Sequence, residues 1–486
     1  MKITLHAAML LSLMALTAGT AAAQGTAELE KLVNQTRREE GMKHGTLSVC
    51  VYNATTGKQV YAHNAEQSVT PASVQKLLTT GVGFARLGSD FRFTTKLAVR
   101  GNIDRDGVLH GNIYLTGGGD PLLGSYRYRQ TTPDTLFESW TKALHKKGIR
   151  RVDGRVCYNV TVFDEQPLHD SWQWGDVGNY YAAGVSGLNF HENMYFVYFN
   201  AGKKLGYPAT AVRTVPKNID IHGTCEVTTA GENTGDQVVV YGSPTGKERL
   251  YRGTVPLGHN DFAVRVAMPT PAKTCADLFS SYLRTHGIGV SSNSMQVYTA
   301  PDSLRAVLDY RSTSYYTIAQ YTNLTSNNIY AESIFKYLGY AQYGIGLFSN
   351  GARAVEDFLK DRNIPASGVR VVDGSGLSRL NTITTDFMCR YLASMTRERY
   401  YDEFLQSIAK AGESGTAKNL LPGLPTGITV HVKTGTMEGV KAYAGYVITP
   451  HGQTLTFAIV SNGHDGSAQE VSAKLNKILY KIATLY

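Results

Sequence analysis

The chain has 486 residues, of which 42% are hydrophobic and 18% are charged. This composition excludes a disordered chain and supplies enough apolar material for a core, while the length favours two or three domains. The formal net charge is +9, but the cations are scattered and form no basic tract. We therefore expect no nucleic-acid partner and only a mild attraction to acidic material.

The first 23 residues have the features of a secretory signal peptide. Lys2 supplies an early cation, an apolar run extends from Met9 to Leu16, and small residues end at Ala23. We expect cleavage near Gln24 and export to the periplasm. The apolar run is short for a membrane span and no later segment is long enough for one, so we expect a soluble protein without a span.

The first elements of the mature chain form a strand pair followed by a helix. Residues 46–53 and 59–64 predict two strands, joined by the turn-rich stretch ATTGK. The chain then enters a helix that begins at Pro71, because proline suits a first turn, where its missing N–H would be unpaired.

The C-terminal end repeats this mixture of strand and helix. Residues 445–449 and 453–463 predict a hairpin through the turn PHG. A helix over about 469–482 closes the chain, and its apolar side consists of Val471, Leu475, Ile478 and Leu479.

The middle of the chain predicts an inserted domain. Two similar phrases begin at Thr132 and Thr270, and each is a helical pattern that ends in Gly-Ile before a strand-like run. The sequence between them is rich in β-formers and turn residues. The predicted units are a discontinuous domain of residues 24–95 and 298–486, an insertion at 96–297, and a nested β-rich subdomain at about 197–265.

Cysteine and histidine patterns predict no metal site, and we expect no cofactor. The HEN stretch, His191–Asn193, lacks the second histidine of a zinc-binding helix. The cysteines form no C-x-x-C pair and are odd in number, so we expect most to be buried small hydrophobes. One disulfide is compatible with the sequence, and its pairing stays open among Cys50, Cys157, Cys225, Cys275 and Cys389.

Ser73 and Lys76 lie three residues apart at the start of the Pro71 helix. This spacing places both side chains on one helical face, where a lysine of lowered pKa can act as the base for a nucleophilic hydroxyl. The pattern alone is weak. Ser333 and Lys336 have the same S-x-x-K spacing, and we interpret them as part of an ordinary amphipathic helix.

Two later motifs favour a functional interpretation of Ser73 and Lys76. Ser326 and Asn328 form S-x-N, and Lys433, Thr434 and Gly435 form K-T-G. The order S-x-x-K, S-D-N, K-T-G is typical of class A β-lactamases and penicillin-binding proteins. Here Asn327 replaces the aspartate of the second motif, and the functional serine and asparagine on either side of it, Ser326 and Asn328, are retained.

Three longer stretches extend the similarity over nearly the whole mature chain. VVDGSGLSRLN at 371–381, LTGGGDPLL at 115–123 and KTGTMEGVKAYAGYV at 433–447 resemble the low-molecular-mass class C penicillin-binding proteins, the D-alanyl-D-alanine carboxypeptidase/endopeptidase family, peptidase family S13. The long insertion between the first and second motifs also resembles that family. The resemblance implies an α+β, transpeptidase-like fold, in which helices flank an antiparallel sheet of about five strands. It also implies peptidoglycan stem peptides as substrate and β-lactam antibiotics as acylating inhibitors.

The resemblance implies a catalytic role at five positions. Ser73 would be the nucleophile and Lys76 its base. Ser326 would relay a proton to the leaving amine, and Asn328 would hold the substrate backbone. Lys433 would add positive potential.

The remaining implied residues bind substrate. Thr434 and Thr436 would bind a terminal carboxylate, with the Thr436 N–H as an oxyanion donor, and Gly435 would leave room for a peptide laid along the strand. The side-chain amine of the stem peptide would meet Asp120, Arg379 and Met437. We expect Asp373 and Ser375 to hold the shape of their own loop instead.

Three other functions share these motifs: a β-lactamase, a hydrolase of another ester or amide, and a non-catalytic wall-binding protein. The long insertion argues against the first, and the retention of all five catalytic positions argues against the last. The balance between carboxypeptidase and endopeptidase cleavage, the diamino-acid specificity, the oligomeric state and the partner proteins stay open.

Overall fold

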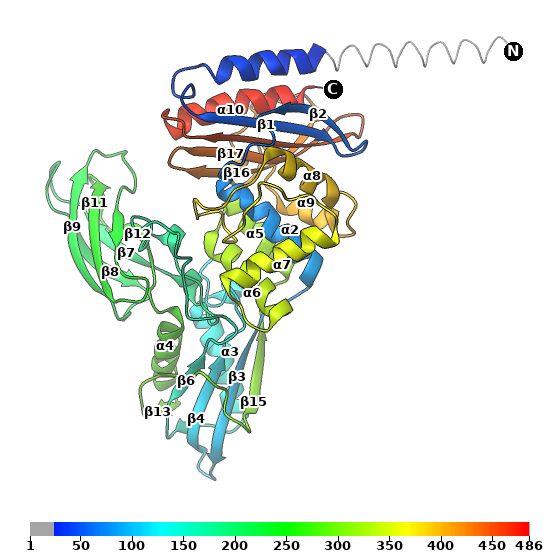
Figure 1. Cartoon of the computed structure of the whole chain (residues 1–486). Coiled ribbons are helices and arrows are strands. Elements are labelled where there is room, and N and C mark those ends of the chain that lie inside the picture. The colour runs from blue at the N-terminus through cyan, green and yellow to red at the C-terminus, as the bar shows by residue number, and fades with distance from the viewer. Residues whose placement is uncertain (1–23, 486) are drawn as a thin grey trace.

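The computed structural model describes residues 24–485. The predicted signal peptide lies outside the described residues, and among those described no helix is long and apolar enough to cross a bilayer. Figure 1 shows an elongated molecule, with a sheet near both termini, a layer of helices beneath it, and two β-rich units farther away.

The sheet near the termini is antiparallel and five-stranded, in the order β16-β17-β18-β1-β2. The strands predicted at both ends of the chain are present, although β17 begins earlier than expected. Its alanines and glycines are weak strand formers, but they pair in register with both neighbours. The bounds are Thr46–Asn53 for β1, Lys58–His63 for β2, Thr429–Met437 for β16, Val440–Ile448 for β17 and Thr454–Asn462 for β18.

Helices cover both faces of this sheet (Figure 1). On one face, α10 (Ala468–Ala483) and a helix of residues 24–36 pack with the sheet around Val33, Leu475 and Ile478. The predicted C-terminal helix is therefore present, and it begins with a capping box in which Ser467 accepts from the Glu470 N–H.

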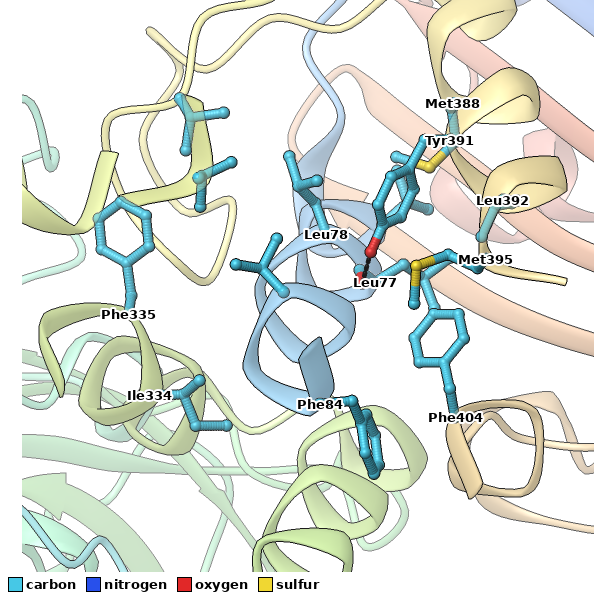
Figure 2. Close-up of a cluster of buried hydrophobic side chains, with 14 of the residues drawn as sticks. Leu77, Leu78, Phe84, Ile334, Phe335, Met388, Tyr391, Leu392, Met395 and Phe404 are labelled. Atoms are coloured by element: carbon cyan, nitrogen blue, oxygen red, sulfur yellow. Dashed lines mark hydrogen bonds between the residues drawn. The ribbon is translucent and has the colours of Figure 1, made fainter. Parts of the chain in front are cut away.

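The other face carries a layer of six helices built around one buried helix. Every residue of α2 from Gln75 to Phe84 is buried, and the side chains in Figure 2 reach it from both sides. The helices of this layer are α2 (Gln75–Leu87), α5 (Tyr315–Thr325), α6 (Asn328–Tyr343), α7 (Phe348–Asp361), α8 (Thr385–Met395) and α9 (Tyr401–Ser407).

Two glycines of α2 allow tyrosines to approach its backbone. A Cβ at Gly81 would lie 2.0 Å from the Tyr391 hydroxyl oxygen, and one at Gly83 would lie 1.9 Å from that of Tyr315. The Tyr391 hydroxyl instead donates to the Leu77 carbonyl at 3.1 Å, as Figure 2 shows. Helix α2 is thus fixed by close packing and by hydrogen bonds to its own backbone.

Leu77→Ala is expected to lower the free energy of unfolding by about 2–5 kcal/mol, because the side chain is fully buried in this layer and its loss leaves a cavity. Chemical denaturation of the mature protein measures the change. Leu380→Ala is the control, since Leu380 is 45% exposed, and its loss is expected to be about 0.5 kcal/mol or less. Equal losses in the two variants would contradict the central place of α2.

The first β-rich unit is a sheet with two helices, α3 (Pro133–Lys146) and α4 (Pro271–Thr285). Each helix begins at the proline of one of the two similar phrases and leads to a short strand, and these strands, β5 and β13, pair in parallel. The strands are β3 (Thr94–Ile103), β4 (Val108–Thr116), β5 (Arg151–Val152), β6 (Val156–Asn159), β13 (Gly289–Val290), β14 (Met295–Gln296) and β15 (Arg305–Arg311).

The edge strand β15 pairs with β3, the first strand of this unit. The predicted insertion, 96–297, ends before β15 begins. We therefore propose residues 94–311 as the inserted unit. A sequence analysis misses β15 because polar and apolar residues along it do not alternate cleanly, and because a turn-rich stretch separates it from β14.

The nested unit consists of two three-stranded sheets that share one core, which includes Tyr195 and Tyr251. The sheet order is β12-β7-β8 in one and β10-β11-β9 in the other, so we propose 194–267 for this unit. Its strands are β7 (Met194–Asn200), β8 (Thr210–Val215), β9 (His222–Ala230), β10 (Val239–Tyr241), β11 (Glu248–Pro256) and β12 (Phe262–Ala267).

All five cysteines lie within the described residues and are free thiols. Four are buried, as the sequence predicts, and Cys225 is exposed. The Cys389 thiol donates to the Cys50 carbonyl at 3.2 Å across the interface of α8 and β1.

Candidate active site

Ser73 lies in a single 3-10 turn, Ala72–Val74, that leads directly into α2. The turn places the Ser73 hydroxyl 2.9 Å from the Lys76 ammonium, which donates to it. Ala72 has a φ of 46°, a left-handed conformation that is rare for alanine. The chain thus holds a strained turn at the serine, as the surroundings of functional residues often require.

Lys76 is fully buried. Its Nζ also donates to the Asn328 Oδ1 at 2.6 Å and to the Ser375 carbonyl at 2.7 Å, so all three donors have partners. Burial lowers the pKa of Lys76 to about 7, although the carboxylates of Glu332 and Asp373 oppose this shift. The predicted lowering is present, and burial rather than a neighbouring cation causes it.

The S-x-N motif forms the junction between α5 and α6. Ser326 ends α5 in a left-handed conformation, and the Asn327 side chain caps α6 by accepting from the Tyr330 N–H at 3.3 Å. Asparagine and aspartate both cap helices well, which accounts for the tolerated departure at this position. The Asn328 amide accepts from Lys76 and donates to the Tyr181 carbonyl at 2.6 Å.

Lys433 connects the third motif to the second. It lies on β16, and its buried Nζ donates to the Ser326 hydroxyl at 2.9 Å and to the Thr434 carbonyl at 2.7 Å. Burial lowers the pKa of Lys433 well below its usual range, and the charges of Lys76 and Lys441 add to the effect. A substrate carboxylate placed here would favour the charged form of Lys433.

The K-T-G strand has a free outer edge beside Ser73. β16 is the edge strand of the sheet, and residues 409–411 pair with only its first half, through Val430 and Val432. A Cβ at Gly435 would lie 2.9 Å from the Ser73 nitrogen, so only glycine allows this approach. The second half of β16 therefore offers backbone groups to an added strand.

The loop of residues 373–381 completes the base of the site. Asp373 accepts hydrogen bonds from the Gly376 and Ser378 N–H groups and from the Trp172 indole, in agreement with its predicted role in loop shape. The Ser375 carbonyl faces Lys76.

Glu332 is a second buried acid that supports this loop, and the sequence analysis missed it. It lies on α6 one turn after Asn328 and accepts from the Gly374 and Ser375 N–H groups, both at 2.8 Å. Burial raises the pKa of Glu332 to about 8. The only signal in the sequence was an acid on an otherwise apolar stretch of helix.

One cavity of about 450 Å³ brings together Ser73, Ser326, Asn328 and Thr436, while Lys76, Lys433, Thr434 and Gly435 are not part of its lining. Arg379 and Met437 lie on its wall, and the buried Arg379 Nε has no hydrogen-bond partner. The lining residues are Ser73, Gln173, Asp176, Tyr181, Ser326, Asn328, Gly376, Leu377, Arg379, Thr436, Met437 and Glu438.

The structure does not bring Asp120 to this cavity, which corrects the prediction for it. Asp120 is 3% exposed and caps the turn that follows β4, where it accepts from the Leu122 N–H at 2.9 Å. Burial raises the pKa of Asp120 to about 7. The glycines before it are tightly packed, Gly117 and Gly118 against backbone of the insertion and Gly119 against the Phe163 ring, and Asp120 is not part of the cavity's lining.

Asp176 occupies the wall instead. It is half-buried, it accepts from the Tyr181 hydroxyl at 3.1 Å, and burial raises its pKa while the charge of Arg379 opposes the shift. Its sequence signal is an acid in the tryptophan-containing stretch WQWGD, which no spacing rule connects to the motifs.

The second S-x-x-K pair is structural. Lys336 forms an ion pair with Asp164 and donates to the Gln166 carbonyl, which joins α6 to the insertion. The Ser333 hydroxyl accepts from Asn189 at 3.2 Å. Neither residue lines the cavity.

No group of three or more acidic, histidine or cysteine side chains within residues 24–485 is arranged to hold a metal ion. In the HEN stretch, His191 bonds to the Met194 carbonyl and Glu192 pairs with Arg127. The arrangement around Ser73 supplies a hydroxyl, an amine base of lowered pKa, and donors for an oxyanion and a carboxylate.

Comparisons with known proteins show the family of the chain and proteins of similar fold. The D-alanyl-D-alanine carboxypeptidase of Actinomadura sp. (strain R39) is 28% identical over 461 residues, which cover 91% of this chain and 82% of that protein. The crystal structure of penicillin binding protein 4 from Haemophilus influenzae has a TM-score of 0.78 at 23% identity, over 93% of this chain and 98% of the other. The same protein in complex with a β-lactam has a TM-score of 0.75 at 22% identity, over the same shares of each chain. The profile of the D-Ala-D-Ala carboxypeptidase 3 (S13) family matches residues 26–481, and the chain belongs to this family of serine peptidases.

Proposed function

We propose that this protein is a serine DD-peptidase of peptidoglycan, which cleaves the bond after D-alanine through an acyl-enzyme on Ser73 and is acylated by β-lactams at the same residue. The observation that carries the proposal is a pair of lysine–serine hydrogen bonds in which both lysines are fully buried and both serines line one cavity. Lys76 bonds to Ser73 and to the Asn328 amide oxygen, and Lys433 bonds to Ser326.

Acylation begins when neutral Lys76 takes the Ser73 proton and the serine oxygen attacks the D-alanyl carbonyl. The backbone N–H groups of Ser73 and Thr436 stabilise the oxyanion. The C–N bond then breaks, and the proton held by Lys76 passes through Ser326 to the leaving amine, so that Lys76 is neutral again and Ser326 keeps its hydroxyl proton. Lys433 with Thr434 and Thr436 binds the carboxylate of the leaving residue.

Deacylation returns the enzyme to its starting state. Water attacks the ester, its proton passes to Lys76, and the Ser73 oxygen recovers a proton as the shortened peptide leaves. The substrate lies along the free half of β16 as an added strand, with the Asn328 amide holding its backbone. That amide donates to Tyr181 in the unliganded chain, so substrate replaces this bond.

The sequence and the family support a periplasmic setting for this activity. The signal-peptide pattern directs the chain to the periplasm, where stem peptides are its substrate. A β-lactam complex of a protein with this fold supports acylation by such drugs. Every step described uses side chains and backbone of this chain and water.

The test is a product analysis with the mature protein. A stem pentapeptide ending in D-Ala-D-Ala and benzylpenicillin are each incubated with it, and mass spectrometry follows free D-alanine and the intact protein mass. We expect D-alanine release and a penicilloyl adduct on Ser73. Drug hydrolysis without an adduct would indicate a β-lactamase, and no reaction with either compound would indicate a non-catalytic binding protein.

Asp176→Asn is expected to lower kcat/KM about 10-fold for stem peptides whose diamino-acid amine is free, because Asp176 is a half-buried carboxylate of the cavity wall and can bind an ammonium. Peptides with that amine acetylated are expected to react nearly equally with both proteins. Asp170→Asn, an exposed aspartate six residues earlier in the same loop, is the control. An equal loss on both peptides would contradict the assignment.

A further inference from the structure

A second cavity, of about 270 Å³, adjoins the active-site cavity. The two cavities share Tyr181, Ser326 and Asn328 as lining residues, so the S-x-N motif lies at the boundary between them. Its far wall is built by the insertion and carries two arginines, Arg127 and Arg265. The proposed chemistry assigns nothing to this space.

Arg127 is held rigidly in that wall. Its Nε donates to the buried carboxylate of Glu192 at 2.5 Å, and its guanidinium stacks on the rings of Tyr126 and Tyr321 at 5.1 and 4.6 Å. The same carboxylate accepts from the Ser125 and Tyr330 hydroxyls. Glu192 thus offsets the charge of Arg127 and fixes the direction in which its terminal nitrogens point.

Arg265 has no ion-pair partner within residues 24–485. It lies on β12, and its guanidinium stacks 3.7 Å from the centre of the Tyr180 ring. No carboxylate oxygen of the described residues lies within 4.0 Å of its nitrogens. Asp236 interacts with it without forming an ion pair, since the charge of Arg265 opposes the rise in the Asp236 pKa that burial causes. A positioned guanidinium that lines a cavity and has no ion-pair partner is suited to bind a carboxylate in a bidentate manner.

We propose that this cavity binds a free carboxylate of the leaving stem peptide when the enzyme cleaves a cross-link, with Arg265 as the main contact and Arg127 as its fixed neighbour. The inference rests on the proposed function, because Ser326 marks the side from which the amine leaves. A single leaving D-alanine has only the carboxylate that Lys433 binds. A leaving stem peptide extends past Ser326 and carries further carboxylates, such as that of its D-isoglutamyl residue.

The test compares two cross-linked stem-peptide dimers that differ at one group. In one, the D-isoglutamyl carboxyl of the leaving stem is free, and in the other it is amidated. We expect kcat/KM of the wild-type protein to favour the free acid about 10-fold, and this ratio to fall to about 1 in Arg265→Gln and to recover in part in Arg265→Lys. The Arg213→Gln control should keep the wild-type ratio, since Arg213 also stacks on a tyrosine of the nested unit but lines neither cavity.

The outcomes separate this inference from the proposed function. A wild-type ratio near 1, or a ratio that persists in Arg265→Gln, would overturn the carboxylate site while D-alanine release from the pentapeptide would still support the DD-peptidase. Failure of the wild-type protein to cut either dimer or the pentapeptide would overturn both. Acylation by benzylpenicillin at the wild-type rate verifies that each variant is folded. If Arg265→Gln does not acylate at this rate, the comparison is made with Arg265→Lys, whose ratio should lie below that of the wild-type protein.

Discussion

Ser73→Ala is expected to form no adduct with benzylpenicillin and to release no D-alanine, while it unfolds at nearly the same denaturant concentration as the wild-type protein. The acyl group needs an oxygen at this position, and removal of a nucleophile that acts with its base lowers kcat by as much as about 10⁶-fold in serine peptidases. The hydroxyl is only partly buried and its one hydrogen bond is to Lys76, so its loss matters little to packing.

The matched control is Ser333→Ala, in the second S-x-x-K pair. Ser333 is buried on α6, three residues before Lys336, and it lies outside the cavity. This variant is expected to lose about 1 kcal/mol of stability with its hydrogen bond to Asn189 but to acylate like the wild-type protein. Intact-mass spectrometry distinguishes the two variants. An adduct on the Ser73→Ala protein would refute the assigned nucleophile.

Lys76→Met is expected to lower the acylation rate by about 10²–10⁴-fold, the usual contribution of a general base. Methionine is similar in length and leaves the Ser73 hydroxyl in place, so drug binding should change less than the rate of acylation. Stopped-flow measurement of acylation by a chromogenic β-lactam gives the two parameters separately. A change confined to binding would indicate that Lys76 positions the site without taking the proton.

The role of Lys76 as the base predicts that the acylation rate of the wild-type protein depends on pH. Only neutral Lys76 can accept the Ser73 proton, and its pKa is about 7. The rate should therefore rise about tenfold per pH unit below 7 and level off above it, and Lys76→Met should lose this limb. A flat wild-type profile between pH 5 and 8 would mean that Lys76 is already neutral throughout, or that another group is the base.

The sequence by itself determined the chemistry and the two ends of the fold. Ser73, Ser326 and Lys433 lie in short motifs whose spacing follows from local geometry, a helix turn in one case and a strand in another, so each motif could be identified without coordinates. The end strands and the C-terminal helix follow from apolar periodicity in the same way. What a motif contains is a local property, and local properties are visible in a sequence.

The tertiary structure alone decided what surrounds the motifs. The sequence pointed to Asp120 and gave no spacing signal for Asp176, but packing buries Asp120 in the insertion and places Asp176 on the cavity wall with Arg379. The lowered pKa of Lys76 and the stacking of Arg265 on the Tyr180 ring likewise depend on burial and on contacts between residues far apart in the chain. Desolvation and long-range contact arise only when the chain is packed, and no spacing of residues in the sequence records them.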